Sequence, residues 1–151
     1  MSEREVQERP LPRPTRISAP FWRGAAEGKL LLQRCRRCGL FIYYPRPFCP
    51  RCLAEELEWH EASGRGRVYT YTVVRRAATP AFAAMVPYVL AIVELEEGPR
   101  LVTNIVGCRP EEVRVEMPVR ATFERLSDEV GLVLFRPDGM ETDSADPEGQ
   151  Q

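Results

Sequence analysis

Two Cys-x-x-Cys pairs constrain this chain more than any other feature of its sequence. Ten residues separate the second cysteine from the third, and the four are Cys35, Cys38, Cys49 and Cys52. A two-residue gap lets the backbone turn tightly enough for both sulfurs of a pair to reach one ion, so two pairs supply four tetrahedral ligands. The sequence therefore predicts a structural zinc ribbon, with a small hairpin between its two metal-binding knuckles.

Other interpretations of these cysteines have less support in the sequence. No signal peptide precedes them, and thiols in the cytosol stay reduced, so we expect a cytoplasmic protein without disulfides. A thioredoxin-like motif would open a helix in a β-α-β unit, and this sequence has no such pattern. Iron takes the same four ligands, so a rubredoxin-like iron site with an electron-transfer role stays open. Either metal is expected to hold the fold rather than to catalyse, because four protein ligands leave no position for water.

Charge is unevenly distributed along the 151 residues. The formal net charge is −1, but residues 1–52 carry 11 basic and 4 acidic side chains, whereas residues 53–151 carry 10 and 18. Binding to a phosphate backbone draws most of its affinity from Lys and Arg. Residues 66–136 carry 9 basic and 9 acidic side chains, and this balance argues against nucleic acid as the partner. No apolar run approaches the ~20 residues of a membrane helix, and we expect no membrane span.

The N-terminal part is predicted to be an extended arm over 1–17, followed by a short helix over 19–27. Three alternating prolines in the arm oppose a helix, and we expect the arm either to be disordered or to lie on a partner. Ser18 is the predicted helix cap. The aromatic residues Phe21 and Trp22 give the helix a face that must be buried, either on the chain's own ribbon or on a partner surface.

Mainly β structure is predicted for the rest of the chain, in two units at 18–63 and 64–136. The helix and a ribbon of three short strands make up the first unit, with the strands at 30–33, 41–44 and 57–62. Five longer strands and one helical turn make up the second unit; the strands fall at 67–76, 88–95, 101–106, 119–126 and 131–136, and the turn at 109–113. Five strands with one helical insertion after the third fit the OB-fold, a five-stranded Greek-key barrel. An acidic tail over 137–151 is expected to be disordered.

On the first barrel strand, Tyr69, Tyr71 and Val73 are expected to share one face because strand side chains alternate. No pattern of a nucleophile with a base occurs, so we expect no catalytic residues. His60 is the only histidine and is expected to be structural, and the lone thiol of Cys108 is expected to be a core residue.

A long apolar loop stands out between the first two barrel strands. Residues 77–87 contain no charged side chain. Surface loops are usually polar, and in OB-folds this loop helps to frame the ligand site, so a ligand or partner is expected to cover it. We expect Phe82 and Met85 to touch the partner or ligand, and Arg75 and Arg76 to meet an anionic group. The alternative is a loop folded onto its own barrel.

The motif order resembles a known family. The run GKLLLQRC at 28–35 leads into the knuckles, and GRGRVYTYTVV at 64–74, PYVLA at 87–91 and EGPRL at 97–101 follow. Over residues 17–136 this is similar to the family of rubredoxin-like zinc-ribbon plus OB-fold proteins that accompany acyl-CoA enzymes.

The resemblance implies a non-catalytic accessory subunit in lipid or steroid metabolism. Members of the family bind thiolase-like enzymes, of aldolase or condensing type, or accompany hot-dog hydratases. They support the assembly and the site that holds the CoA thioester, so a hetero-oligomer that binds acyl-CoA is implied here. The resemblance assigns zinc to the four cysteines. It assigns no CoA contact to any residue of this chain. A nucleic-acid-binding protein is the alternative, because zinc ribbons and OB-folds also serve that function.

Overall fold

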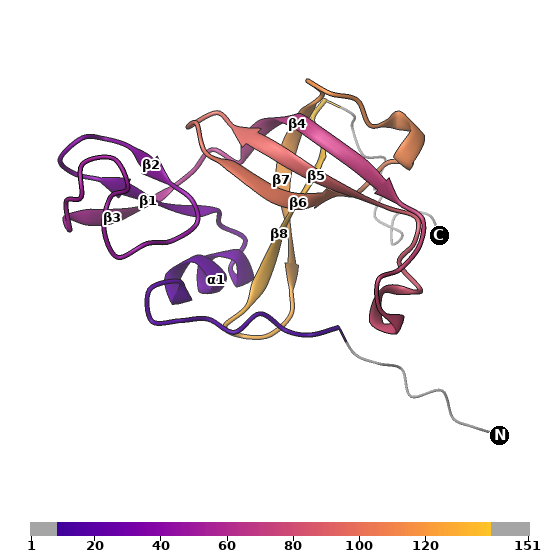
Figure 1. Ribbon diagram of the computed structural model, residues 1–151, viewed down its shortest axis with the longest axis horizontal. Coiled ribbons are helices and arrows are strands. Elements are labelled where there is room, and N and C mark those ends of the chain that lie inside the picture. Colours follow the sequence, from indigo (N-terminus) through magenta and orange to yellow (C-terminus); the bar gives the residue numbers. More distant parts are fainter. Residues whose placement is uncertain (1–8, 140–151) are drawn as a thin grey trace, which may run out of the picture.

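The computed structural model describes residues 9–139 and divides them into a small sheet, one helix and a closed barrel. Figure 1 shows the small sheet at one end of the molecule and the barrel at the other, with helix α1 (Ala19–Ala26) between them. The mainly β architecture predicted from the sequence is confirmed. No helix within residues 9–139 is long and apolar enough to cross a membrane.

The ribbon consists of three antiparallel strands with β1 in the centre. They are β1 (Leu31–Cys35), β2 (Phe41–Ile42) and β3 (Leu57–Glu61), in the order β2-β1-β3. β1 continues to the first metal cysteine, whereas β2 is shorter than the predicted 41–44. Tyr43 and Tyr44 leave the sheet because their rings pack around Phe21, with centroids 5.6 and 6.3 Å from its ring.

Helix α1 starts at Ala19 as predicted and ends one residue earlier, at Ala26. Ser18 makes no side-chain cap to the helix. Its Oγ instead accepts a hydrogen bond from the backbone N–H of Thr15 (2.8 Å), and the Ser18 N–H donates to Thr15 Oγ1 (3.1 Å). Ser18 therefore occupies the predicted position just before the helix, but its side chain bonds to Thr15 and does not cap the helix.

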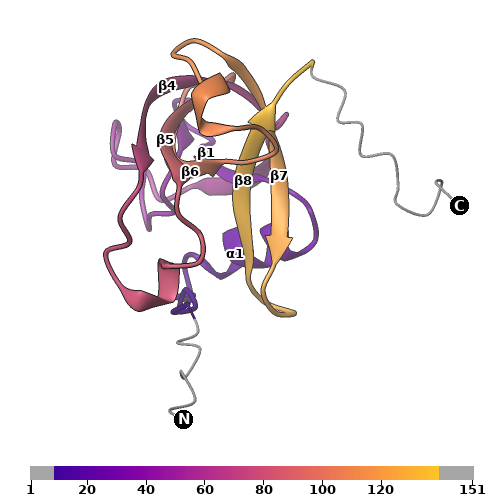
Figure 2. The same ribbon diagram turned by 90° about the vertical axis from the view of Figure 1, so that its right-hand side faces the viewer.

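The barrel has the strand order expected of an OB-fold. Its strands are β4 (Arg65–Val74), β5 (Tyr88–Leu95), β6 (Arg100–Ile105), β7 (Pro118–Arg125) and β8 (Gly131–Pro137). They close in the order β4-β5-β6-β8-β7, in which β6 and β8 form the parallel pair. Two short 3-10 helices interrupt the connections, η1 (Pro80–Phe82) and η2 (Pro110–Glu112). Figure 2 shows β7 and β8 side by side above α1.

A β-bulge changes the predicted faces of β4. Pairing with β5 shifts between Val68 and Thr70, which inserts Tyr69 as an extra residue. Tyr69 therefore points outward, whereas Tyr71 and Val73 pack against the core. The prediction that all three share a face is wrong, because one extra residue reverses the alternation on one side of the bulge.

One hydrophobic core joins the barrel to the helix and the ribbon. Phe21, Leu30 and Leu32 belong to the same cluster of buried residues as Val68, Val93 and Phe135 from inside the barrel. Trp59 packs against this core from β3, whereas the neighbouring His60 is exposed and lies edge-on to the Phe41 ring. The helix and ribbon are thus docked on the barrel by shared apolar burial, which is the dominant favourable term in folding.

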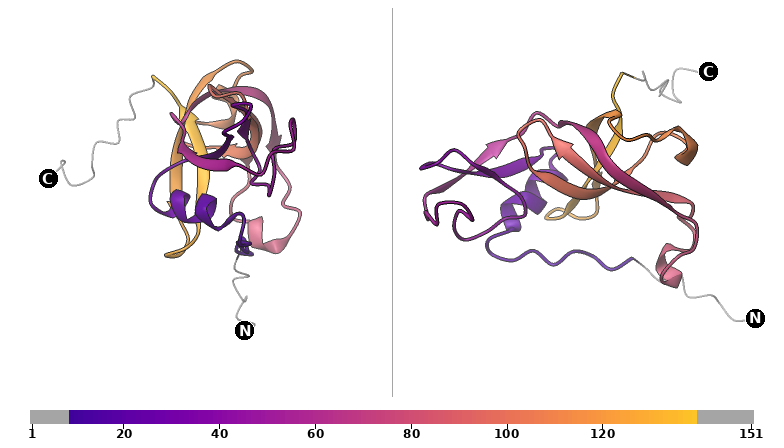
Figure 3. Two further views of the ribbon diagram at one scale, coloured as in Figure 1. Left: turned by 90° about the vertical axis from the view of Figure 1, so that its left-hand side faces the viewer. Right: turned by 45° about the horizontal axis from the view of Figure 1, so that its top comes forward.

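The described part of the N-terminal arm lies on the chain's own barrel. Residues 9–17 run beneath the barrel from α1 toward the loop that contains η1, as Figure 1 and the right view of Figure 3 show. Arg9 fastens this segment through an ion pair of 2.6 Å with Glu124 on β7. Residues 1–8 of the predicted arm and 140–151 of the predicted acidic tail lie outside the described residues, and Pro137 belongs to β8.

Candidate functional site

The four predicted metal ligands come together at the far end of the ribbon. Their Sγ atoms all lie within 4.8 Å of one another. The Sγ atoms of Cys35 and Cys52 are 3.6 Å apart, as are those of Cys38 and Cys49. Four sulfurs at about 2.3 Å from a tetrahedral zinc ion would be about 3.8 Å apart, so the cluster fits the metal without rearrangement.

Two knuckles of matching geometry present these sulfurs. In each, the backbone N–H four residues after the first cysteine donates to that cysteine's carbonyl: Gly39 to Cys35 at 2.8 Å and Leu53 to Cys49 at 2.9 Å. Both Gly39 and Leu53 have a left-handed backbone, with φ of 78° and 63°. The sequence pointed to Gly39, but the same conformation at Leu53 carried no signal because leucine rarely adopts it.

Backbone donors also favour the thiolate form at two of the four cysteines, Cys35 and Cys49. The Cys38 N–H lies 3.5 Å from Cys35 Sγ, and this bond is the main cause of the lowered pKa of Cys35. Burial raises the pKa of Cys49, but N–H groups of Cys52 and Arg51 together outweigh it and lower that pKa to about 6. Since the thiolate is the form that binds metal, these donors favour the ligand state.

The helix residues predicted to meet a partner differ in exposure. Phe21 is 3% exposed and lies at the centre of an aromatic cluster with Trp22, Tyr43 and Tyr44. Trp22 is half-buried, and its Nε1 has no acceptor among the described residues. Phe21 is buried in the chain's own core and is not available to a partner. Of the two helix residues predicted to contact a partner, Trp22 therefore remains.

The loop residues predicted to meet a partner are accessible. The connection between β4 and β5 runs over 75–87, in which Arg75 and Arg76 are exposed, Met85 is 36% exposed and Phe82 is half-buried. The structure does not place this loop next to the metal. It does place it on the same side of the molecule as α1, with the arm between them (Figures 1 and 3).

The N-terminal arm adds exposed apolar side chains on the side of the molecule that carries α1 and the η1 loop. Leu11 is 57% exposed and Ile17 39% exposed, although residues 9–17 lie against the barrel. The proline alternation predicted an extended chain, but no local pattern could show which surface that chain follows.

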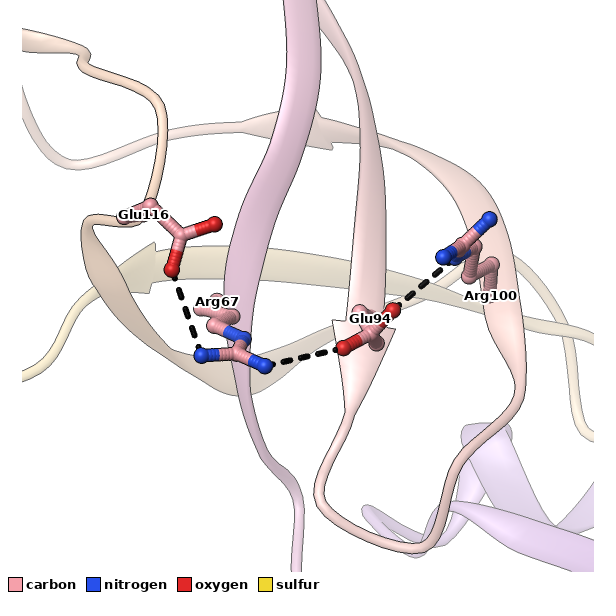
Figure 4. A network of polar contacts seen from close by, with 4 residues as sticks. All are labelled: Arg67, Glu94, Arg100 and Glu116. Atoms are coloured by element: carbon pink, nitrogen blue, oxygen red, sulfur yellow. Dashed lines mark hydrogen bonds and ion pairs between the residues drawn. The ribbon is translucent and has the colours of Figure 1, made fainter.

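The outer surface of the β4-β5-β6 sheet carries charged side chains of both signs. Arg67 binds both Glu94 and Glu116, and Glu94 also binds Arg100, at distances of 2.9 to 3.2 Å (Figure 4). Arg100 also lies over the Tyr69 ring, 3.8 Å from its centroid. Two positive and two negative side chains therefore satisfy one another on this face.

Models of two domain families match most of the chain. The ChsH2 rubredoxin-like zinc ribbon domain matches residues 22–58, and the ChsH2 C-terminal OB-fold domain matches residues 59–124. Among solved structures, one described as an Ltp2-ChsH2(DUF35) aldolase is 40% identical, with a TM-score of 0.74, over 83% of this chain and 98% of that one. A DUF35-family protein from Sulfolobus solfataricus, 20% identical with a TM-score of 0.54, shows the fold alone.

Relatives of two kinds share the sequence. A DUF35 domain-containing scaffold protein of Methanocaldococcus jannaschii is 43% identical over 72% of this chain and 77% of its own length. A probable enoyl-CoA hydratase alpha subunit of Thermomonospora curvata is 40% identical over 85% of this chain, but the match spans only 40% of that relative. The chain therefore belongs to the family of ChsH2 zinc-ribbon and OB-fold proteins, and its four cysteines form the structural zinc site of that family.

Proposed function

We propose that this chain is a non-catalytic accessory subunit of an acyl-CoA enzyme, which it binds and whose CoA thioester site it supports. The observation that carries the proposal is the likeness to the solved Ltp2-ChsH2(DUF35) aldolase, at 40% identity over 98% of the matched chain. A thiolase-like enzyme of aldolase or condensing type is the partner that this likeness favours.

A hot-dog hydratase is the second partner within the same proposal. Two relatives are described as hydratase alpha subunits, from Thermomonospora curvata and Mycobacterium tuberculosis, the latter named for 3-oxo-4,17-pregnadiene-20-carboxyl-CoA. The match spans only 40% of each, so most of their length has no counterpart here. We rank the thiolase-like partner first because the match covers 98% of one chain of the solved Ltp2-ChsH2(DUF35) structure.

The chemistry of the described residues supports an accessory role. The four cysteines complete the zinc coordination and leave no position for a substrate. Burial, with a smaller contribution from Glu112, raises the pKa of the Cys108 thiol and disfavours its nucleophilic form. The His60 ring lies edge-on to Phe41, and its side chain makes no hydrogen bond to any residue of 9–139.

Isolation from the source cells tests the proposal. We expect a thiolase-like enzyme or a hot-dog hydratase to co-purify with the tagged chain in near-equal amount, and the complex to bind an acyl-CoA. Recovery of nucleic acid without either enzyme would overturn the proposal and favour the nucleic-acid-binding alternative.

Substitution of the apolar loop tests where the partner or thioester binds. We expect the double change Phe82→Ser and Met85→Ser to leave the fold intact, because neither side chain is part of the buried core. Loss of two apolar contacts should weaken binding of the enzyme or acyl-CoA about tenfold or more, measured by calorimetry.

A matched control comes from the other side of the barrel. Val115 is 54% exposed in the connection that follows η2, which lies opposite the η1 loop in Figures 1 and 2. Val115→Ser removes similar apolar surface and should leave both affinities within about twofold. Wild-type binding of both ligands by the loop variant would refute this role of Phe82 and Met85.

A further inference from the structure

Three segments distant in sequence form one side of the molecule. They are the arm (9–17), helix α1 and the β4–β5 loop (75–87), and all views of Figures 1 to 3 place them together below the barrel. Arg9 ties the arm to β7, and α1 packs on β7 and β8. We refer to these three segments as the arm–helix–loop face.

This face carries positive charge that the residues of 9–139 leave largely without ion-pair partners. The segments contain no Asp, Glu or Lys and six arginines: Arg9, Arg13, Arg16, Arg23, Arg75 and Arg76. Of these six arginines, Arg9 alone forms an ion pair within residues 9–139, and the other five are exposed. The arginines of Figure 4 differ from these five, because Arg67 and Arg100 both form ion pairs with the carboxylate of Glu94.

Apolar side chains lie among these arginines. Leu11, Ile17 and Met85 are exposed, and Trp22 and Phe82 are half-buried. Protein interfaces are enriched in aromatic residues, Met and Arg and depleted of Lys, Glu and Asp. The arm–helix–loop face has this composition, whereas the rest of the described chain mixes both signs of charge.

We propose that the arm–helix–loop face is the docking surface for the enzyme subunit, which meets it with carboxylates placed around an apolar centre. The identity of that subunit rests on the proposed function, and the charge and apolar pattern of the face do not depend on it. Five arginines that have no carboxylate partner within residues 9–139 are electrostatically complementary to an acidic surface. Such complementarity steers encounter and fixes the orientation of docking.

Two other occupants fit the face less well. Single-stranded nucleic acid binds through aromatic rings on which bases stack. The most exposed apolar side chains of this face, Leu11 and Ile17, are aliphatic, and its aromatic residues Trp22 and Phe82 are half-buried. A small phosphate ligand requires donors that converge, whereas these arginines are distributed over three segments along the length of the molecule.

Charge reversal on two segments tests the proposal. The probe is the purified enzyme subunit that co-purifies with this chain, titrated against Arg16→Glu in the arm and Arg76→Glu in the loop. We expect each variant to bind at least about tenfold more weakly at low salt, mainly through slower association, and to lose part of the salt dependence of the wild type. Unfolding is not expected, since neither side chain forms a recorded contact within residues 9–139.

The control is Arg114→Glu, an exposed arginine in the connection after η2, on the opposite side of the barrel. It makes the same change in net charge and should bind within about twofold of the wild type. Equal weakening by all three variants would attribute the effect to net charge, and wild-type affinity of Arg16→Glu and Arg76→Glu would remove the face from the interface; either result overturns the inference.

Failure of the docking face can be distinguished from failure of the proposed function. A thiolase-like or hydratase partner that binds all variants equally would refute the face and leave the function standing. A co-purifying enzyme of another class that loses affinity only for Arg16→Glu and Arg76→Glu would support the face and refute the function. A fluorescent 20-nucleotide DNA strand that binds tightly and loses affinity in these variants, with no protein partner recovered, would refute both.

Discussion

Replacement of Cys49 by serine should release the zinc and unfold the tip of the ribbon, while the barrel stays folded. Cys49 is fully buried and belongs to a second, small cluster of buried residues with Cys35, Ile42 and Ala54. A core of this size cannot offset the chain entropy of two knuckles, so metal binding supplies the folding free energy of this part. In small zinc domains that term is about 10–16 kcal/mol.

The barrel should survive because it has a separate source of stability. Its core cluster includes Val68, Val93 and Phe135 and shares no residue with the cluster around the metal. We expect metal analysis of Cys49→Ser to show zinc far below one equivalent. Amide spectra should lose dispersion for residues 35–56 and keep it for residues 88–137.

Cys108→Ser is the matched control, since Cys108 is the fifth cysteine and is not one of the four clustered ligands. It should keep one equivalent of zinc. Retention of zinc by Cys49→Ser would contradict the assignment of the site, and a coloured wild-type protein that contains iron would contradict the choice of metal.

Gly131→Ala should separate α1 from the barrel and lower the melting temperature substantially. A Cβ at position 131 would lie 2.3 Å from the Ala25 carbonyl carbon and 2.4 Å from the Ala26 nitrogen. Both are backbone atoms of the helix, so no side chain can rotate away, and either α1 or β8 must move. Overpacking of this kind costs about 3 kcal/mol, which corresponds to roughly 10 °C for a chain of this size.

The control is Gly28→Ala, at a glycine that follows the same helix. No atom lies within 4 Å of a Cβ built there, and its φ of 79° adds only the conformational cost of a left-handed alanine, about 1 kcal/mol. Calorimetry should therefore rank Gly131→Ala well below Gly28→Ala in melting temperature. Equal values would show that the contact between α1 and β8 does not limit stability.

The two variants should also differ in partner binding if the arm–helix–loop face is the docking surface. Displacement of α1 moves one of its three segments, whereas Gly28→Ala leaves the helix in place. We therefore expect Gly131→Ala to weaken binding of the enzyme subunit at temperatures where the barrel is still folded.

Local sequence signals predicted the metal site and most of the strands. The spacing of Cys35 and Cys38, repeated at Cys49 and Cys52, fixes ligand geometry within each pair, so few long-range contacts are needed to recognise it. The strands of the barrel were found within a few residues of their true ends because apolar alternation is a local property. Contacts with distant residues set where each strand ends. The pairing of β2 with β1 stops at Ile42 because Tyr43 and Tyr44 turn toward Phe21.

The errors arose where a distant contact overrides a local preference. Ser18 stands at the cap position, but its side chain bonds to Thr15 of the arm and not to the helix. Tyr69 falls in an unbroken alternating run, yet the register with β5 requires one extra residue there. No sequence pattern marks Gly131 as a close approach of helix and strand.

The sequence by itself determined the zinc ligands, the β-rich architecture and the apolar loop, since each depends on residues that are neighbours in the chain. Only the tertiary structure decided that the arm, α1 and the loop share one side, and that Phe21 is buried while Trp22 remains accessible. The physical reason is that surfaces are assembled from segments far apart in sequence. Their juxtaposition follows from the shared core of barrel, helix and ribbon, which no single segment encodes.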